Sequence, residues 1–147
     1  MDPIVLRALG VLVLVAVLAL AGRWWLWQDG RTRSDPDAPG LDGGELDAVG
    51  LDLDGADAGA VLLSSSTCAP CVQVRRVLAE LTSERAGFRW VDVDAADHLD
   101  LAERHAVRRV PTVLVVAPSG RLLARAGGVP SASELRRVLD GERQPTS

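Results

Sequence analysis

Between residues 58 and 143, apolar runs of strand length alternate with amphipathic helix patterns. The expected strands are 60–63, 88–93, 112–116 and 122–124, and the expected helices are 72–84, 99–105 and 131–141. A strand, helix and strand in succession predict a parallel pair with a right-handed crossover. The Pro-Ser-Gly turn at 118–120 predicts that the last two strands are antiparallel. This order therefore predicts an α/β domain with a mixed central sheet and helices on both faces.

Two cysteines, Cys68 and Cys71, lie between the first expected strand and the first expected helix. A helix N-terminus favours a thiolate over a thiol, because unpaired N–H groups and the positive end of the helix dipole face it. Cys71 lies one helical turn from Cys68 and can reach the same sulfur. The pair therefore predicts Cys68 as the attacking thiolate and Cys71 as the resolving thiol, cycling between dithiol and disulfide.

Two alternatives remain for the cysteine pair. One is a structural disulfide without turnover, and the other is a zinc site. Zinc needs four ligands, and only His98 and His105 could join the cysteines. Their separation of seven exceeds the usual spacing of about three to five residues between zinc-binding histidines. We therefore expect no metal and no cofactor, and we expect both histidines to face solvent on their helix.

Residues 1–28 are apolar and carry only Asp2, Arg7 and Arg23 as charged side chains. The uncharged run 8–22 would span about 22 Å as a helix, against about 30 Å for the hydrocarbon core of a bilayer. Apolar residues before the run and three tryptophans after it extend this length, and both arginines can snorkel to the interfaces. The pattern predicts a single N-terminal transmembrane anchor over 1–28.

A cleaved signal peptide is the alternative for this segment, because Ala-Leu-Ala at 19–21 resembles a cleavage site. The positive charge before the run is weak, however, and cleavage there would leave three tryptophans exposed at the new N-terminus. One arginine precedes the span, while Arg23, Arg31 and Arg33 follow it. The positive-inside rule therefore favours a cell-membrane protein whose following domain is cytoplasmic.

Residues 29–57 contain nine acidic and two basic side chains, a net charge of −7 in a chain whose total is −4. Its Gly- and Pro-rich part, 29–44, predicts a flexible linker, followed by a domain over 45–143 and a tail over 144–147. The acidic residues lack the spacing of an EF-hand calcium loop. The acidic balance of the chain also argues against nucleic-acid binding. We expect a monomer.

Two segments of this chain resemble the thioredoxin family. Residues 66–71 read Ser-Thr-Cys-Ala-Pro-Cys and match the family's redox motif, and residues 107–112 read Val-Arg-Arg-Val-Pro-Thr and match the segment that carries its cis-proline. The likeness covers roughly 45–142. It implies a thioredoxin fold and a membrane-tethered thiol-disulfide oxidoreductase, acting mostly as a reductase, similar to membrane-bound thioredoxin-like proteins of bacteria. Its partners would be protein or small-molecule disulfides and an upstream thiol reductant.

The resemblance also implies which residues contact a substrate. Pro111 would be cis, and Val110 would offer its backbone groups to an extended substrate segment. Thr67 precedes the first cysteine, and Gly127 and Gly128 fall near the family's glycine close to the active site. These five residues are the expected substrate-binding residues.

The chain departs from the family pattern at two positions. Thr67 stands where the family usually has tryptophan, which alters the substrate-contact surface. Leu62 stands where many thioredoxins have a buried aspartate that helps to deprotonate the second cysteine. Without that carboxylate, we expect Cys71 to be harder to activate. No histidine lies between the cysteines, so strong oxidant behaviour is not indicated.

Two other functions fit the same sequence. The first is a redox-inert module with the thioredoxin fold that holds a partner through the face of Pro111. The second is an extracytoplasmic thiol reductase for envelope or cytochrome-maturation substrates, which depends on the side of the membrane that the domain occupies.

Overall fold

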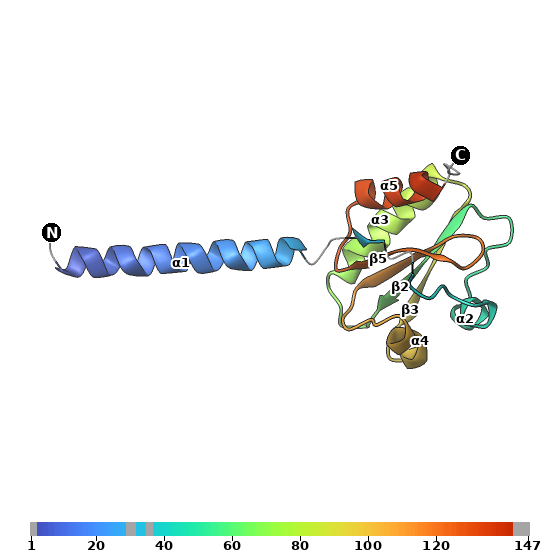
Figure 1. The fold of residues 1–147 in the computed structure, drawn as a ribbon, viewed down its shortest axis with the longest axis horizontal. Helices are drawn as coiled ribbons and strands as arrows, with labels where there is room; N and C mark the ends of the chain where they lie inside the picture. The colour runs from blue at the N-terminus through green and yellow to red at the C-terminus, as the bar shows by residue number, and fades with distance from the viewer. Residues whose placement is uncertain (1–2, 29–31, 35–36, 143–147) are drawn as a thin grey trace.

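The computed structural model describes residues 3–28, 32–34 and 37–142 (Figure 1). Its elements are α1 (Pro3–Gln28), β1 (Thr32–Arg33), α2 (Gly43–Val49), β2 (Ala58–Ser64), α3 (Cys71–Glu84), β3 (Phe88–Asp94), α4 (Leu99–Arg104), β4 (Thr112–Val116), β5 (Leu122–Gly127) and α5 (Ala132–Glu142). The strand and helix order expected from residue 58 onward is confirmed. Helix α1 lies outside the layers that the other elements form.

The strands form one mixed sheet in the order β1-β5-β4-β2-β3. Strands β2 and β3 are parallel and joined through α3, as the strand-helix-strand pattern predicted. Strand β4 pairs antiparallel with both β2 and β5, and the turn at 118–120 joins β4 to β5. Gly120 in this turn has a φ of 82°, a left-handed conformation that glycine adopts without strain.

Two apolar cores lie on opposite faces of the sheet. Helices α3 and α5 cover one face, and α2 and α4 cover the other (Figure 1). The central strand β2 contributes to both cores: Leu62 belongs to the first core, Val61 and Leu63 belong to the second, and all three are fully buried. Because β2 is covered on both faces, its sequence is a continuous apolar run without polar alternation.

Helix α2 and strand β1 were not expected from the sequence. Asp42 caps α2, its side chain accepting a hydrogen bond from the N–H of Glu45, whose carboxylate accepts one from the N–H of Asp42. Leu41 and Val49 are buried in the second core with other residues of this region. Strand β1 pairs with β5, although it lies within the segment 29–44 expected as a linker. Residues 29–31 and 35–36 of that segment, and the expected tail 144–147, lie outside the described residues.

The last helix begins behind Ser131 and ends one residue beyond the expected range 131–141. The N–H of Glu134 donates to the Ser131 hydroxyl, and the N–H of Ser131 donates to the Glu134 carboxylate. The expected range ends at Gly141, whereas α5 continues to Glu142. A Cβ at Gly141 would face open space and its φ is not in the left-handed region, so nothing in the structure requires glycine at this position.

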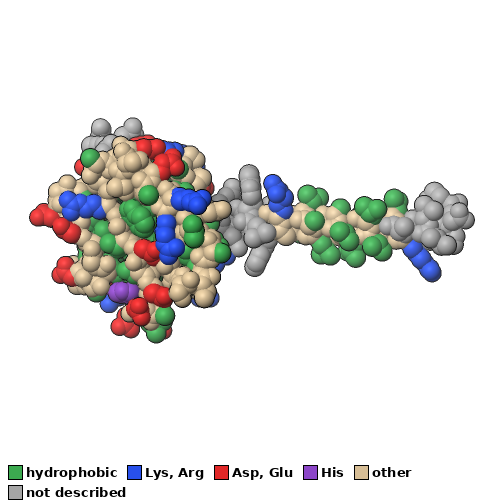
Figure 2. Space-filling model, turned by 180° about the vertical axis from the view of Figure 1, so that it is seen from behind, with side chains coloured by type: hydrophobic (Ala, Val, Ile, Leu, Met, Phe, Trp, Pro, Cys, Tyr) green, Lys and Arg blue, Asp and Glu red, His purple; other side chains and the backbone are tan. Residues whose placement is uncertain are grey.

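Helix α1 exposes large apolar side chains along its described length (Figure 2). These side chains are between 55% and 69% exposed and occupy positions 9, 11–15, 17, 18 and 20, so they surround the helix axis. Within the described residues, no helix combines the length and the apolar character needed to cross a membrane.

Candidate active site

Cys68 and Cys71 form a disulfide at the start of α3, with their Cα atoms 5.4 Å apart. Cys71 is the first residue of the helix and is fully buried. Cys68 lies in the turn between β2 and α3 and is half-buried. Of the two sulfurs, Cys68 is therefore the one that another molecule can approach first.

The turn that holds the disulfide is continuous with the first turn of α3. Pro70 is the N-cap of the helix, where its missing N–H removes no helical hydrogen bond. The N–H of Cys71 donates to the carbonyl of Cys68, and the N–H of Val72 donates to the carbonyl of Ala69. These bonds hold both sulfurs at the positive end of the helix dipole, which favours a thiolate after reduction.

The segment before β4 reaches the same end of the sheet. Thr112, the first residue of β4, lies opposite Leu63 near the end of β2 and opposite Gly127 at the end of β5. The Val110–Pro111 peptide bond is cis, as the resemblance implied. The register therefore brings Val110 and Pro111 to the end of the sheet where the cysteine turn begins.

The two expected glycines lie beside this proline. The N–H of Gly128 donates to the carbonyl of Pro111 at 2.8 Å, and Gly128 has a φ of 90°. A Cβ on Gly127 would lie 3.4 Å from Nε of Arg109, so the guanidinium of Arg109 packs over this glycine. Thr67, the fifth expected substrate-binding residue, is exposed next to Cys68. Their roles in binding a substrate stay a prediction.

A polar cluster beside the cysteine turn was missed by sequence reasoning. The Ser64 hydroxyl donates to one carboxylate oxygen of Asp92 at 2.5 Å, and Nε of Arg75 donates to the other at 2.5 Å. A second nitrogen of Arg75 lies 3.4 Å from the Ser64 hydroxyl. We call these three residues the Arg75–Asp92 cluster; they come from β2, α3 and β3.

The register of β2 and β3 explains where Asp92 lies. Asp92 pairs with Leu62, and paired residues of neighbouring strands share a face of the sheet. Phe88 and Trp90 on the same face of β3 pack into the core under α3. The available signal was the two-residue period of this strand, which places Asp92 on the same face as α3.

His105 is buried, so the expectation that it faces solvent was wrong. Its side chain is 1% exposed, and its Nε2 lies 3.6 Å from a carboxylate oxygen of Glu45 on α2. Neither ring nitrogen forms a hydrogen bond within the described residues. Helix α2, which the sequence did not predict, covers the end of α4 and buries this ring. His98, by contrast, is half-buried.

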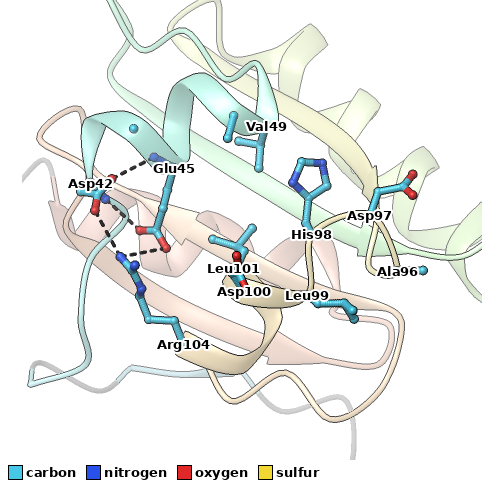
Figure 3. Close-up of a pocket in the computed structure, with 12 residues that line it drawn as sticks. Asp42, Glu45, Val49, Ala96, Asp97, His98, Leu99, Asp100, Leu101 and Arg104 are labelled. Atoms are coloured by element: carbon cyan, nitrogen blue, oxygen red, sulfur yellow. Dashed lines mark hydrogen bonds and ion pairs between the residues drawn. The ribbon is translucent and has the colours of Figure 1, made fainter.

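A cleft of about 600 Å³ lies between α2 and α4 (Figure 3). Asp42, Glu45 and Arg104 form ion pairs along one side of it. His98 lines the cleft from the loop before α4. The cleft includes neither cysteine, and among the described residues no group of metal-ligating side chains is close enough to hold an ion.

We expect His105 to make the fold less stable in acid. Burial lowers the pKa of His105; Glu45 opposes this shift, and the charge of Arg104 adds to it. The unfolded chain therefore takes up a proton as the pH falls through the ordinary histidine value of 6.5, while the folded chain resists it. The free energy of unfolding should fall as the pH drops below about 6.5 and level off below the folded pKa.

This expectation can be tested by urea unfolding at pH values from 7.5 to 5, in steps of roughly half a pH unit. His105→Gln should remove this part of the pH dependence, while the matched variant His98→Gln should keep it. An equal pH dependence in all three proteins would contradict the assignment to His105.

Comparison with known protein families finds one matching domain. The sequence model of the family described as Thioredoxin matches residues 56–141. Thioredoxin M3, chloroplastic, from Oryza sativa subsp. japonica is 29% identical over 75 residues, and Thioredoxin C-2 from Corynebacterium nephridii is 34% identical over 74. Each match covers 50% of this chain; the matched parts span 43% of the rice protein and 68% of the bacterial one.

Solved structures share the fold of this chain. A mutant thioredoxin from Halobacterium salinarum NRC-1 superposes with a TM-score of 0.59 at 22% identity, covering 78% of this chain and 99% of its own. The oxidised form of mitochondrial thioredoxin 3 from Saccharomyces cerevisiae gives a TM-score of 0.54 at 20% identity, covering 65% and 87%. At these identities the likeness shows the fold, which is the thioredoxin fold with its mixed sheet.

Proposed function

Because this chain belongs to the thioredoxin family, we propose that it is a thiol-disulfide oxidoreductase that works through Cys68 and Cys71, mostly as a reductase. The observation that carries this proposal is the cysteine pair at the start of α3, with Cys71 buried and Cys68 accessible. The cis-proline segment lies at the same end of the sheet and supports the same function.

The reaction exchanges one disulfide for another in two steps. The Cys68 thiolate attacks a sulfur of the substrate disulfide, which forms a mixed disulfide and releases one substrate thiolate. Cys71 then loses its proton to solvent, and its thiolate attacks the Cys68 sulfur. This second attack forms the Cys68–Cys71 disulfide and releases the other substrate thiolate, and both released thiolates take up protons. An upstream thiol reductant returns the pair to the dithiol.

The backbone beside Pro111 is the proposed binding edge for the substrate. An extended segment can pair with the backbone groups of Val110, as in β-augmentation. Gly127 and Gly128 border this edge without side chains, and Thr67 borders it beside Cys68. Main-chain pairing selects for an extended conformation more than for a sequence, so the proposed substrates are exposed disulfides in flexible protein segments.

The reduction of insulin by dithiothreitol tests the proposed activity, because the reduced chains precipitate and scatter light. The full chain should shorten the lag before precipitation, and the same protein with both thiols alkylated should not. If the two preparations behave alike, the oxidoreductase proposal fails. The redox-inert binding module then becomes the better description.

We further propose that residues 1–28 anchor the domain in the cell membrane. The support is the uncharged run 8–22 and the exposed apolar side chains around α1, which water solvates poorly. The three arginines after this run support a cytoplasmic domain. A C-terminal fusion to alkaline phosphatase, which is active only outside the cytoplasm, should be inactive in membrane fractions. An active fusion would support the extracytoplasmic reductase instead.

A further inference from the structure

We propose that Arg75 is a positioning residue for the second step of the exchange reaction, acting through Cys71. Its guanidinium favours the Cys71 thiolate, and the Asp92 carboxylate limits this effect. This inference rests on the proposed oxidoreductase function and adds the residue that determines how readily the mixed disulfide is resolved.

The place of Arg75 on α3 carries the first part of the argument. Arg75 follows Cys71 by four residues, so the two side chains lie on the same side of the helix, one turn apart. Helical side chains also lean toward the N-terminus of their helix, which directs Arg75 back toward the first turn. The next arginine, Arg76, is exposed.

The contacts of the Arg75–Asp92 cluster carry the second part. The Arg75 side chain is 40% exposed and that of Asp92 is 26% exposed, so neither charge is fully screened by water. Ser64 contacts both of them and is itself the last residue of β2, immediately before the cysteine turn. The guanidinium is therefore held between the end of β2 and the start of α3.

The cluster lies beside the buried strand that leads to the cysteine turn, because Asp92 is the partner of Leu62 on the neighbouring strand. Cys71 is fully buried, and burial alone disfavours a thiolate. A fixed cation one turn away offsets this penalty. Arg108 and Arg109 belong to the loop before β4 and are unchanged in the variants below.

Substitutions of Arg75 and of Asp92 should change the stability of the Cys71 thiolate in opposite directions. Arg75→Gln removes the cation and leaves the Asp92 carboxylate without its ion-pair partner, and both changes disfavour the Cys71 thiolate. Asp92→Asn removes only the anion and should favour the thiolate. A purely structural role would predict that both variants impair the protein, because both break the same ion pair.

The reaction of the reduced full chain with an aromatic disulfide that releases a coloured thiolate separates the two steps. The first phase depends on the reagent concentration and reports the attack by Cys68. The second phase is independent of it and reports the attack by Cys71 on the mixed disulfide. Substitutions in the Arg75–Asp92 cluster should strongly change only the rate of the second phase.

At pH 7 we expect the second phase of Arg75→Gln to be about threefold slower than that of the wild type. One pKa unit lowers the thiolate fraction about tenfold, and the higher nucleophilicity of a more basic thiolate recovers about threefold. Asp92→Asn should be faster by a similar factor. Arg75→Lys should lie near the wild type, and Arg76→Gln, which removes the same charge from the same helix, should match it. At alkaline pH, where Cys71 is a thiolate in every variant, the order should reverse, and Arg75→Gln, with the more basic thiolate, should be about threefold faster than the wild type.

The outcomes distinguish this inference from the function on which it rests. A wild-type chain without a second phase would overturn both. A wild-type chain with two phases, together with variants that are unchanged or that both slow the second phase, would leave the oxidoreductase function standing and overturn the role of Arg75. Circular dichroism of each variant verifies that it is folded.

Discussion

Cys68→Ser should reduce the turnover of insulin to the rate of dithiothreitol alone, because the proposed mechanism makes the half-buried Cys68 the attacking thiolate. Serine at position 71 should have a different effect. The Cys71→Ser chain keeps the attacking thiolate but has no second thiol to resolve the mixed disulfide. It should therefore remain covalently joined to its substrate.

Non-reducing gel electrophoresis measures this difference directly. Incubated with an oxidised protein, Cys71→Ser should run as a heavier species that dithiothreitol converts back to the free chain. Cys68→Ser is the matched control, because it also retains one of the two cysteines, the one that is fully buried in the oxidised protein. If Cys68→Ser traps substrate as well as Cys71→Ser does, the assigned order of attack is wrong.

Leu78→Ala should give the largest loss of stability that we predict for a single substitution. Leu78 is fully buried on α3, in the core between that helix and the sheet. Truncating a buried leucine costs about 3 kcal/mol, since apolar burial is lost and a cavity remains. For a domain of this size the midpoint of thermal unfolding should fall by roughly 10–20 °C.

Thermal unfolding followed by circular dichroism, with the disulfide kept oxidised, measures this shift. Leu99→Ala is the matched control, because Leu99 begins α4 and is 62% exposed. That substitution should change the unfolding free energy by no more than about 0.5 kcal/mol. Equal shifts in the two variants would mean that the core under α3 does not determine the stability of the domain.

The elements with strong local patterns could be predicted from the sequence. Strand β4 begins and ends at the expected residues, and α3 was expected from its amphipathic spacing. The turn at 118–120 predicted the antiparallel pairing of β4 with β5 correctly. In each case the signal lies within a few consecutive residues, so no knowledge of distant contacts was needed.

The elements that depend on distant partners could not be predicted. Strand β1 has only two residues and exists through its pairing with β5. Helix α2 begins with two glycines, which have low helix propensity, and only the Asp42–Glu45 capping box indicates it. The burial of His105 follows from α2, so one missed helix also caused the wrong expectation for this side chain.

The residues of the candidate site also fall into those that a local sequence motif predicts and those that depend on distant contacts. Short motifs were enough to make Cys68, Cys71 and Pro111 candidate site residues. Their meeting at one end of the sheet depends on the register in which Leu63 lies opposite Thr112. The Arg75–Asp92 cluster joins three elements, and no motif within one segment predicts such a meeting.

The pairing of β1 with β5 limits the distance between the end of α1 and the domain that carries the cysteine pair. If the acidic segment 29–44 were free throughout, an extended chain would separate α1 from the domain by up to about 60 Å. With Thr32 docked on β5, only residues 29–31 remain between the end of α1 and the sheet, a span of at most about 14 Å. With α1 in a bilayer, the domain would stay at the membrane surface. Its substrates would then be disulfides presented at that surface, and those deeper in the surrounding compartment would be out of reach.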